Sequence, residues 1–109
     1  MARILVVDDD VNVASLVREI LDDDGHVVTE LHDPGAAFTA ISGSRYDLLI
    51  SDIAMPGEDG LSLLARMRSL GLVENIPVLF ITAHVDDDYR RAAEVLGAAD
   101  ILAKPFTVD

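Results

Sequence analysis

Acidic residues, one hydroxyl and one lysine stand at the ends of four apolar segments of this sequence. In chain order they are Asp8, Asp9, Asp52, Thr82 and Lys104. Three carboxylates brought together repel one another unless a cation neutralises them. Carboxylate oxygens without His or Cys favour Mg²⁺, which readily adds phosphate as a ligand. A metal ion, an ammonium and a hydroxyl can hold the oxygens of a phosphoryl group, and a carboxylate can attack its phosphorus to give an acyl phosphate.

Each of these residues also has an ordinary structural interpretation. The acidic run Asp8-Asp9-Asp10 could cap a helix, whose N-terminus favours negative charge, and Asp52 could be a turn residue. It is their joint occurrence that indicates phosphoryl chemistry. Lys104 supports it, because it is the only lysine among eight basic residues. A compact ammonium is retained where a planar guanidinium does not fit.

The apolar segments predict strands that alternate with helices. We predict strands over residues 3–7, 27–31, 48–51, 78–81 and 101–103. Helical periodicity fills the segments between them, from Val13 to Leu21, from Pro34 to Ile41, from Leu61 to Leu70 and over 86–96. For the third helix we expect Leu61, Leu64, Met67 and Leu70 on the buried face. This alternation predicts an α/β, doubly wound, five-stranded parallel sheet, whose ligand site lies beyond the carboxyl ends of the strands.

Length and composition exclude several classes of protein. The 109 residues suffice for one domain, and half of them are apolar, which excludes a disordered chain. The net charge of −12 argues against direct binding to nucleic acid. No apolar run is long enough to span a membrane, and the N-terminus does not read as a signal peptide. With no cysteine for disulfides, we expect a cytoplasmic protein.

Four motifs together resemble the receiver domain of bacterial response regulators. They are RILVVDDD at 3–10, DIAMPGEDG at 52–60, Thr82-Ala83 and Lys104-Pro105-Phe106. The resemblance covers nearly the whole chain and implies one receiver domain over 1–109 with a flavodoxin-like strand order 2-1-3-4-5. It implies that Asp52 accepts a phosphoryl group from the phosphohistidine of a histidine kinase or phosphotransfer protein, or from acetyl phosphate. Beyond its own phosphorylation and dephosphorylation, no enzymatic activity is expected.

The resemblance also implies a metal site at the phosphoacceptor. Asp9 and Asp52 are expected to bind Mg²⁺ directly together with the backbone carbonyl of Ala54, and Asp8 acts through water. Mn²⁺ is a possible substitute.

Further roles implied by the resemblance concern the phosphoryl group and the switch. Lys104 pairs with the acceptor carboxylate and then with the phosphoryl oxygens. Thr82 moves its hydroxyl onto the phosphoryl group, aided by the backbone amide of Ala83. Pro105 matches a position whose preceding peptide bond is usually cis. This movement is expected to switch the surface of the fourth helix and fifth strand, which could also form a homodimer.

Four features of the sequence bear on how far it follows the family pattern. Ile101 stands where the family usually has Tyr or Phe, so the switch residue beside Thr82 has no ring to rotate. Ala54 and His84 occupy the positions that tune the attack of water on the phosphoryl group. The sequence reaches only five residues past Lys104, and the fifth helix of the family is therefore missing. We expect an apolar strip to be left open, most simply because the chain is part of a longer protein; a covering partner or second copy, or lower stability, would also fit.

Three other functions would each require a feature that can be checked in the sequence. A Ca²⁺ loop starting at Asp8 would need Gly where Val13 stands. A phosphohydrolase would need a general-acid Asp at residue 54. A flavin mononucleotide site would need hydroxyls and glycines where the acidic run stands. A receiver-like interaction module that works without phosphorylation remains the open alternative.

Overall fold

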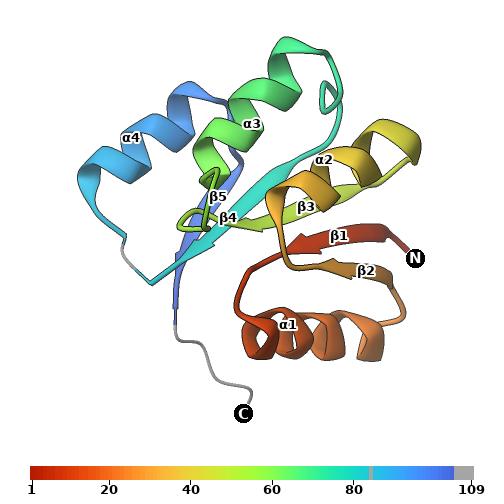
Figure 1. Cartoon of the computed structure of the whole chain (residues 1–109). Coiled ribbons are helices and arrows are strands. Elements are labelled where there is room, and N and C mark those ends of the chain that lie inside the picture. Colours follow the sequence, from red (N-terminus) through yellow and green to blue (C-terminus); the bar gives the residue numbers. More distant parts are fainter. Residues whose placement is uncertain (84, 105–109) are drawn as a thin grey trace.

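A parallel sheet of five strands runs through the centre of the computed structural model, which describes residues 1–83 and 85–104 (Figure 1). The strands are β1 (Arg3–Val7), β2 (Val27–Leu31), β3 (Leu48–Asp52), β4 (Val78–Thr82) and β5 (Asp100–Ala103). All neighbours pair in parallel, and their order is β2-β1-β3-β4-β5. The predicted fold class and strand order are therefore confirmed.

Four helices connect the strands within the described residues. They are α1 (Val11–Asp23), α2 (Pro34–Gly43), α3 (Gly60–Ser69) and α4 (Asp87–Val95). An aspartate precedes each helix and accepts hydrogen bonds from the first-turn backbone amides, at Asp10, Asp33, Asp59 and Asp86. Part of the acidic excess thus serves helix capping, and the capping interpretation holds for Asp10. None of these helices is long and apolar enough to cross a membrane.

The two faces of the sheet are covered unequally. Helices α2, α3 and α4 lie on one face, and α1 is the only helix of the described residues on the other (Figure 1). Alternate residues of β1 show the division: Leu5 and Val7 belong to the core under α2 and α3, whereas Ile4 and Val6 pack with Ala14 of α1. Side chains of the other strands that point toward this second face lie on the same side of the sheet as α1.

An apolar groove remains open between α1 and β5. It holds about 170 Å³ and is lined by the aliphatic residues Val17, Ile20, Leu21, Ile50, Leu79, Ile81 and Leu102. Leu102 is 44% exposed. The fifth helix of the family is absent from the described part of the chain, and the open apolar strip expected from its absence is present.

The expected buried face of α3 was partly wrong. Leu64 and Met67 are buried as predicted, but Leu70 is 60% exposed and Leu63 is buried instead. Residues three apart drift by about 60° around an α-helix of 3.6 residues per turn. Leu70 therefore lies on the opposite side from Leu61, and it is the C-cap rather than a member of the helix.

One arginine ties the end of α3 to the end of α4. The guanidinium of Arg68 donates to the backbone carbonyls of Leu96, Gly97 and Val73. Leu96 is the C-cap of α4, where unpaired carbonyls attract a cation. Arg68 thus fixes the connection from α4 to β5 against α3.

Candidate functional site

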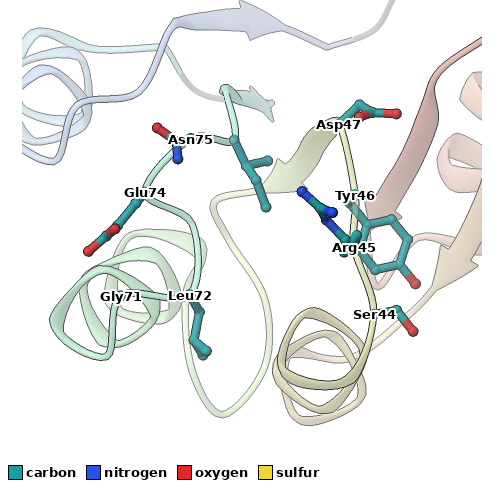
Figure 2. Close-up of a pocket in the computed structure, with 9 residues that line it drawn as sticks. Ser44, Arg45, Tyr46, Asp47, Gly71, Leu72, Glu74 and Asn75 are labelled. Atoms are coloured by element: carbon teal, nitrogen blue, oxygen red, sulfur yellow. The ribbon is translucent and has the colours of Figure 1, made fainter.

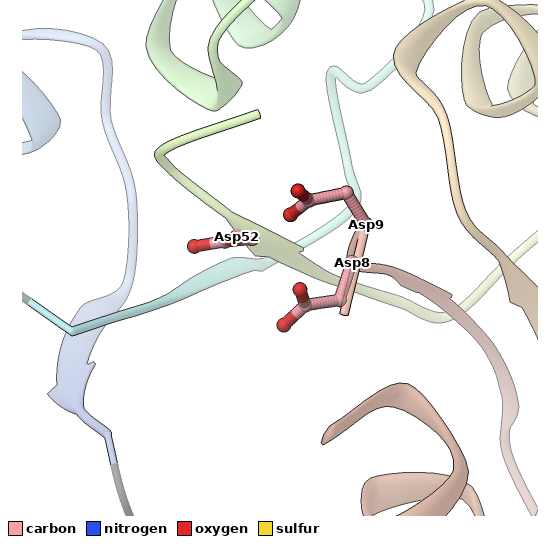
Figure 3. A group of neighbouring side chains, drawn as sticks. All are labelled: Asp8, Asp9 and Asp52. Atoms are coloured by element: carbon pink, nitrogen blue, oxygen red, sulfur yellow. The ribbon is translucent and has the colours of Figure 1, made fainter. Parts of the chain in front are cut away.

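Three aspartates meet at the carboxyl edge of the sheet (Figure 3). Asp8 follows β1 directly, Asp9 comes next, and Asp52 is the last residue of β3. One oxygen from each carboxylate lies within 4.8 Å of the others. Asp8 is fully buried and Asp52 is 3% exposed, whereas Asp9 is exposed to solvent. The structure thus brings together the three acidic residues that the sequence singled out.

Lys104 reaches the same cluster from the end of β5. Its Nζ lies 2.8 Å from Asp8 Oδ2 and 3.3 Å from Asp52 Oδ2. The backbone amide of Lys104 donates to the carbonyl of Thr82 at 2.7 Å, which continues the β4–β5 pairing to this point. One ammonium therefore bridges the two buried carboxylates.

Burial and charge shift the pKa values of these groups in opposing ways. Burial raises the pKa of Asp52 to about 6, and the negative charge of Asp8 acts in the same direction against the opposing ammonium of Lys104. Burial alone would lower the pKa of Lys104, but its contacts with Asp8 and Asp52 outweigh this and raise it. Lys104 is therefore charged near neutral pH, and the ionised form of Asp52 lowers the stability of the folded state.

The residues expected to hold a metal ion fit a divalent cation. Asp8 Oδ2 is fully buried, and no donor among the described residues reaches it at a hydrogen-bonding angle. The ammonium at 2.8 Å pairs with it by charge, but two carboxylates share this one cation while Asp9 lies beside them. A cluster of hard oxygens with excess negative charge is the donor set that Mg²⁺ prefers.

The remaining predicted residues surround this cluster. Thr82 is buried at the end of β4, and Ala83 and Ala54 are exposed in the loops that follow β4 and β3. Ile101 is buried on the opposite face of β5 from Lys104, in the core that contains Phe80. His84 and Pro105 lie outside the described residues.

A cavity larger than the apolar groove between α1 and β5 lies away from these residues. It holds about 420 Å³ between the loops 44–47 and 71–76, which lead into β3 and β4 (Figure 2). It therefore lies at the amino ends of the strands, at the opposite edge of the sheet from Asp52. Its lining contains none of the residues singled out above, so cavity size does not locate the acidic site.

Two residues without a predicted role contact the backbone of Asp52. Ser51 donates its hydroxyl to the Asp52 carbonyl at 2.9 Å, and Gly60 packs against the same carbonyl. The sequence held one weak signal: a glycine is the first residue of α3, right after the capping Asp59, where helix propensity gives it no advantage.

Fold and site together define an α/β domain with an acidic cluster at the carboxyl edge of its sheet, and comparison with known proteins names its family. The chain matches the response regulator receiver domain over residues 4–109. It is 39% identical over 102 residues to an uncharacterized 14.6 kDa protein of the sodA1 3′ region of Leptolyngbya boryana, covering 94% of this chain and 78% of that protein. It is also 39% identical over 107 residues to the response regulator MprA of Mycobacterium ulcerans, covering 98% of this chain and 45% of MprA.

Solved structures agree with this assignment. The chemotaxis protein CheY4 of Vibrio cholerae superposes with a TM-score of 0.92 at 29% identity, covering 98% of this chain and 89% of that one. The response regulator TrrA of Thermotoga maritima, solved with Mg²⁺ and BeF, gives 0.85 at 31% identity, covering 100% and 91%. The chain belongs to the response regulator receiver family of two-component signal transduction.

Proposed function

We propose that this receiver accepts a phosphoryl group on Asp52 and switches the α4–β5 surface in response. The donor is the phosphohistidine of a histidine kinase or phosphotransfer protein, or a small acyl phosphate such as acetyl phosphate. The observation that carries the proposal is the position of Lys104 Nζ, 3.3 Å from Asp52 Oδ2 inside a buried acidic cluster. A purely structural ion pair would not need two further aspartates beside it.

The transfer step forms one bond and breaks one. An oxygen of the Asp52 carboxylate attacks phosphorus, while the bond from phosphorus to the donor's imidazole nitrogen, or to the oxygen of acetate, breaks. The leaving group keeps the electron pair of the broken bond, and Asp52 becomes an acyl phosphate. Water later attacks the phosphorus, which restores the carboxylate and releases inorganic phosphate.

A divalent cation belongs to this proposal. Asp9, Asp52 and the carbonyl of Ala54 would hold Mg²⁺, with Asp8 acting through water and Mn²⁺ as a possible substitute. The ion supplies positive charge to the phosphoryl oxygens. The acidic cluster and the Mg²⁺–BeF complex of TrrA support this assignment.

The chain's own cation and hydroxyl would stabilise the product. Lys104 already faces the acceptor oxygen and would follow the charge onto the phosphoryl oxygens. Thr82, buried at the end of the neighbouring strand, would donate its hydroxyl to a second oxygen, and the backbone amide of Ala83 would donate to it as well. The contacts with the phosphoryl oxygens would form only after transfer, so they would favour the phosphorylated arrangement.

The switch would act through α4 and β5. Thr82 precedes the connection to α4, and Ile101 lies behind it in the core. Movement of Thr82 toward the phosphoryl group would vacate space that Ile101 fills by shifting, without the rotation of an aromatic ring. We propose that a partner, or a second copy in a homodimer, reads the α4–β5 surface, that the domain itself does not bind nucleic acid, and that it acts in the cytoplasm.

The chain spans less than half of MprA. We therefore propose phosphoryl acceptance for residues 1–109 only. The test is incubation with Mg²⁺ and acetyl phosphate, which should add one phosphoryl mass to the wild type and none to Asp52→Asn. A folded wild type that takes up no phosphoryl group from acetyl phosphate or from a kinase would favour a phosphorylation-independent interaction module.

A further inference from the structure

The backbone carbonyl of Asp52 is enclosed by two small residues. The hydroxyl of Ser51 donates to it at 2.9 Å, and Ser51 is 1% exposed. Gly60 also lies so close that a Cβ atom on it would overlap with the carbonyl oxygen. The same Cβ would lie 3.1 Å from the carbonyl carbon of Asp52 and 3.1 Å from Cα of Ile53. All three neighbours are main-chain atoms, which cannot move without moving the phosphoacceptor.

Space, rather than backbone conformation, makes Gly60 necessary. The four glycines with positive φ are Gly25, Gly57, Gly71 and Gly97, so Gly60 has a φ that other residues adopt. Gly43, which also lies in a helix, has nothing within 4 Å of the corresponding Cβ position. The two glycines therefore differ in what an added methyl group would meet.

Gly60 also closes the loop that follows the phosphoacceptor. Its backbone amide donates to the carbonyl of Ile53 at 2.7 Å. The loop between these two residues carries Ala54. A displacement at Gly60 would therefore move both the Asp52 carboxylate and the carbonyl of Ala54.

We propose that Gly60 and Ser51 are positioning residues, which fix the main chain of Asp52 so that its carboxylate meets Lys104 and the Ala54 carbonyl faces the same site. This inference rests on the proposed phosphotransfer, which it deepens. The start of α3 limits the movement of the Asp52 carbonyl by contact, and the hydrogen bond from the Ser51 hydroxyl limits it by attraction. With its main chain fixed in this way, Asp52 directs its carboxylate toward Nζ of Lys104, which lies 3.3 Å from Oδ2.

Two variants and two matched controls test the inference. Gly60→Ala adds the overlapping methyl group, and Gly43→Ala adds one to a helix at an open position. Ser51→Ala removes the hydrogen bond to Asp52, and Ser42→Ala removes an exposed hydrogen bond, from the Ser42 hydroxyl to the Phe38 carbonyl of α2 at 2.8 Å. The maximal rate of phosphorylation by acetyl phosphate, at saturating Mg²⁺, should fall on the order of a hundredfold in Gly60→Ala, as for a misplaced reacting group. The rate of Ser51→Ala should fall by a smaller factor, and the rates of both controls should match that of the wild type.

A second readout does not depend on phosphorylation. The ¹³C chemical shift of the Asp52 backbone carbonyl should change in Gly60→Ala and in Ser51→Ala and stay constant in both controls. Wild-type rates together with an unchanged carbonyl shift in folded Ser51→Ala would overturn the inference, even if Gly60→Ala failed to fold. An equal loss of rate in Gly43→Ala would overturn it as well. If the wild type itself is not phosphorylated, the proposed function fails, and the carbonyl shifts alone decide whether the positioning is correct.

Discussion

The ammonium of Lys104 lies 3.3 Å from Oδ2 of Asp52 and 2.8 Å from Oδ2 of Asp8. Asp52 ends β3 and Lys104 directly follows β5, and the parallel order of the sheet places the ends of these two strands on either side of β4. Because a single cation serves two buried carboxylates, the site has spare negative charge in its resting state. That imbalance is what a divalent cation would correct, and it has measurable consequences for stability.

Replacing Asp52 by Asn should stabilise the fold in a pH-dependent manner. The pKa of Asp52 is raised from 3.8 to about 6, so between these values the folded state binds more protons than the unfolded state. The cost of the carboxylate therefore grows as the pH rises through this window and is fully present above it. Without divalent cations, the free energy of unfolding of Asp52→Asn should exceed that of the wild type by on the order of 2 kcal/mol at about pH 7. Urea unfolding in EDTA measures the difference, which should shrink between about pH 6 and pH 4; a difference that grows toward low pH would contradict the burial of this carboxylate.

Replacing Lys104 by Met should weaken the metal-free fold and strengthen metal binding. It leaves Asp8 and Asp52 buried without their cation, which costs roughly 3 kcal/mol of unfolding free energy. Mg²⁺ should bind more tightly, since the ammonium no longer repels it. Denaturant unfolding with and without Mg²⁺ measures both effects. Arg45→Met is the control, because it removes one positive charge at the opposite edge of the sheet, where Arg45 has no ion pair within the described structure. Equal behaviour of the two variants would refute the bridging role of Lys104.

Replacing Ala54 by Arg should lengthen the lifetime of the phosphorylated state. Ala54 is small and exposed two residues after Asp52, the proposed phosphoacceptor, which leaves room for water to approach the phosphorus. A long side chain there should slow the decay several-fold by occupying that room. Loss of the phosphoryl mass over time, after removal of acetyl phosphate, gives the rate. The phosphorylated state of Ala65→Arg, a change at an exposed position of α3, should decay at the wild-type rate. An unchanged rate of decay in Ala54→Arg would contradict the expectation.

Replacing Arg68 by Met should destabilise the fold without affecting phosphorylation. Arg68 donates to three backbone carbonyls that join α3 to the end of α4. Hydrogen bonds from a charged donor contribute a few kcal/mol, and part of this is recovered by water at the surface, so we expect a loss of about 2 kcal/mol. Unfolding in urea tests this against Arg90→Met, an exposed residue of α4. Equal stability of the two variants would show that the three hydrogen bonds contribute little.

The positions of β1, β3, β4 and β5 were predictable because each contains a short apolar run followed by a polar residue. Strand β2 differs, since it contains Thr29 and Glu30, and the strand order was implied by the family resemblance. Asp8, Asp52 and Lys104 could be grouped from the sequence since parallel strands place their carboxyl ends at one edge. The buried face of α3 was less predictable: apolar residues at intervals of three drift around the helix, so Leu70 faces solvent.

Contacts that depend on tertiary packing left no reliable pattern in the sequence. The carbonyl partners of Arg68 lie 5, 28 and 29 residues away, and nothing in its local sequence distinguishes it from Arg66. Gly60 belonged to a recognised motif, but its need for space became visible only where α3 meets the main chain of Asp52.

The most direct test of the account is the intact mass of the protein after incubation with Mg²⁺ and acetyl phosphate, with Asp52→Asn measured beside the wild type. Circular dichroism establishes that both are folded. We expect one phosphoryl group on the wild type, none on the variant and none when Mg²⁺ is removed by chelation. A folded wild type that stays unmodified, here and with a histidine kinase as the donor, or an adduct of equal yield on Asp52→Asn, would contradict it.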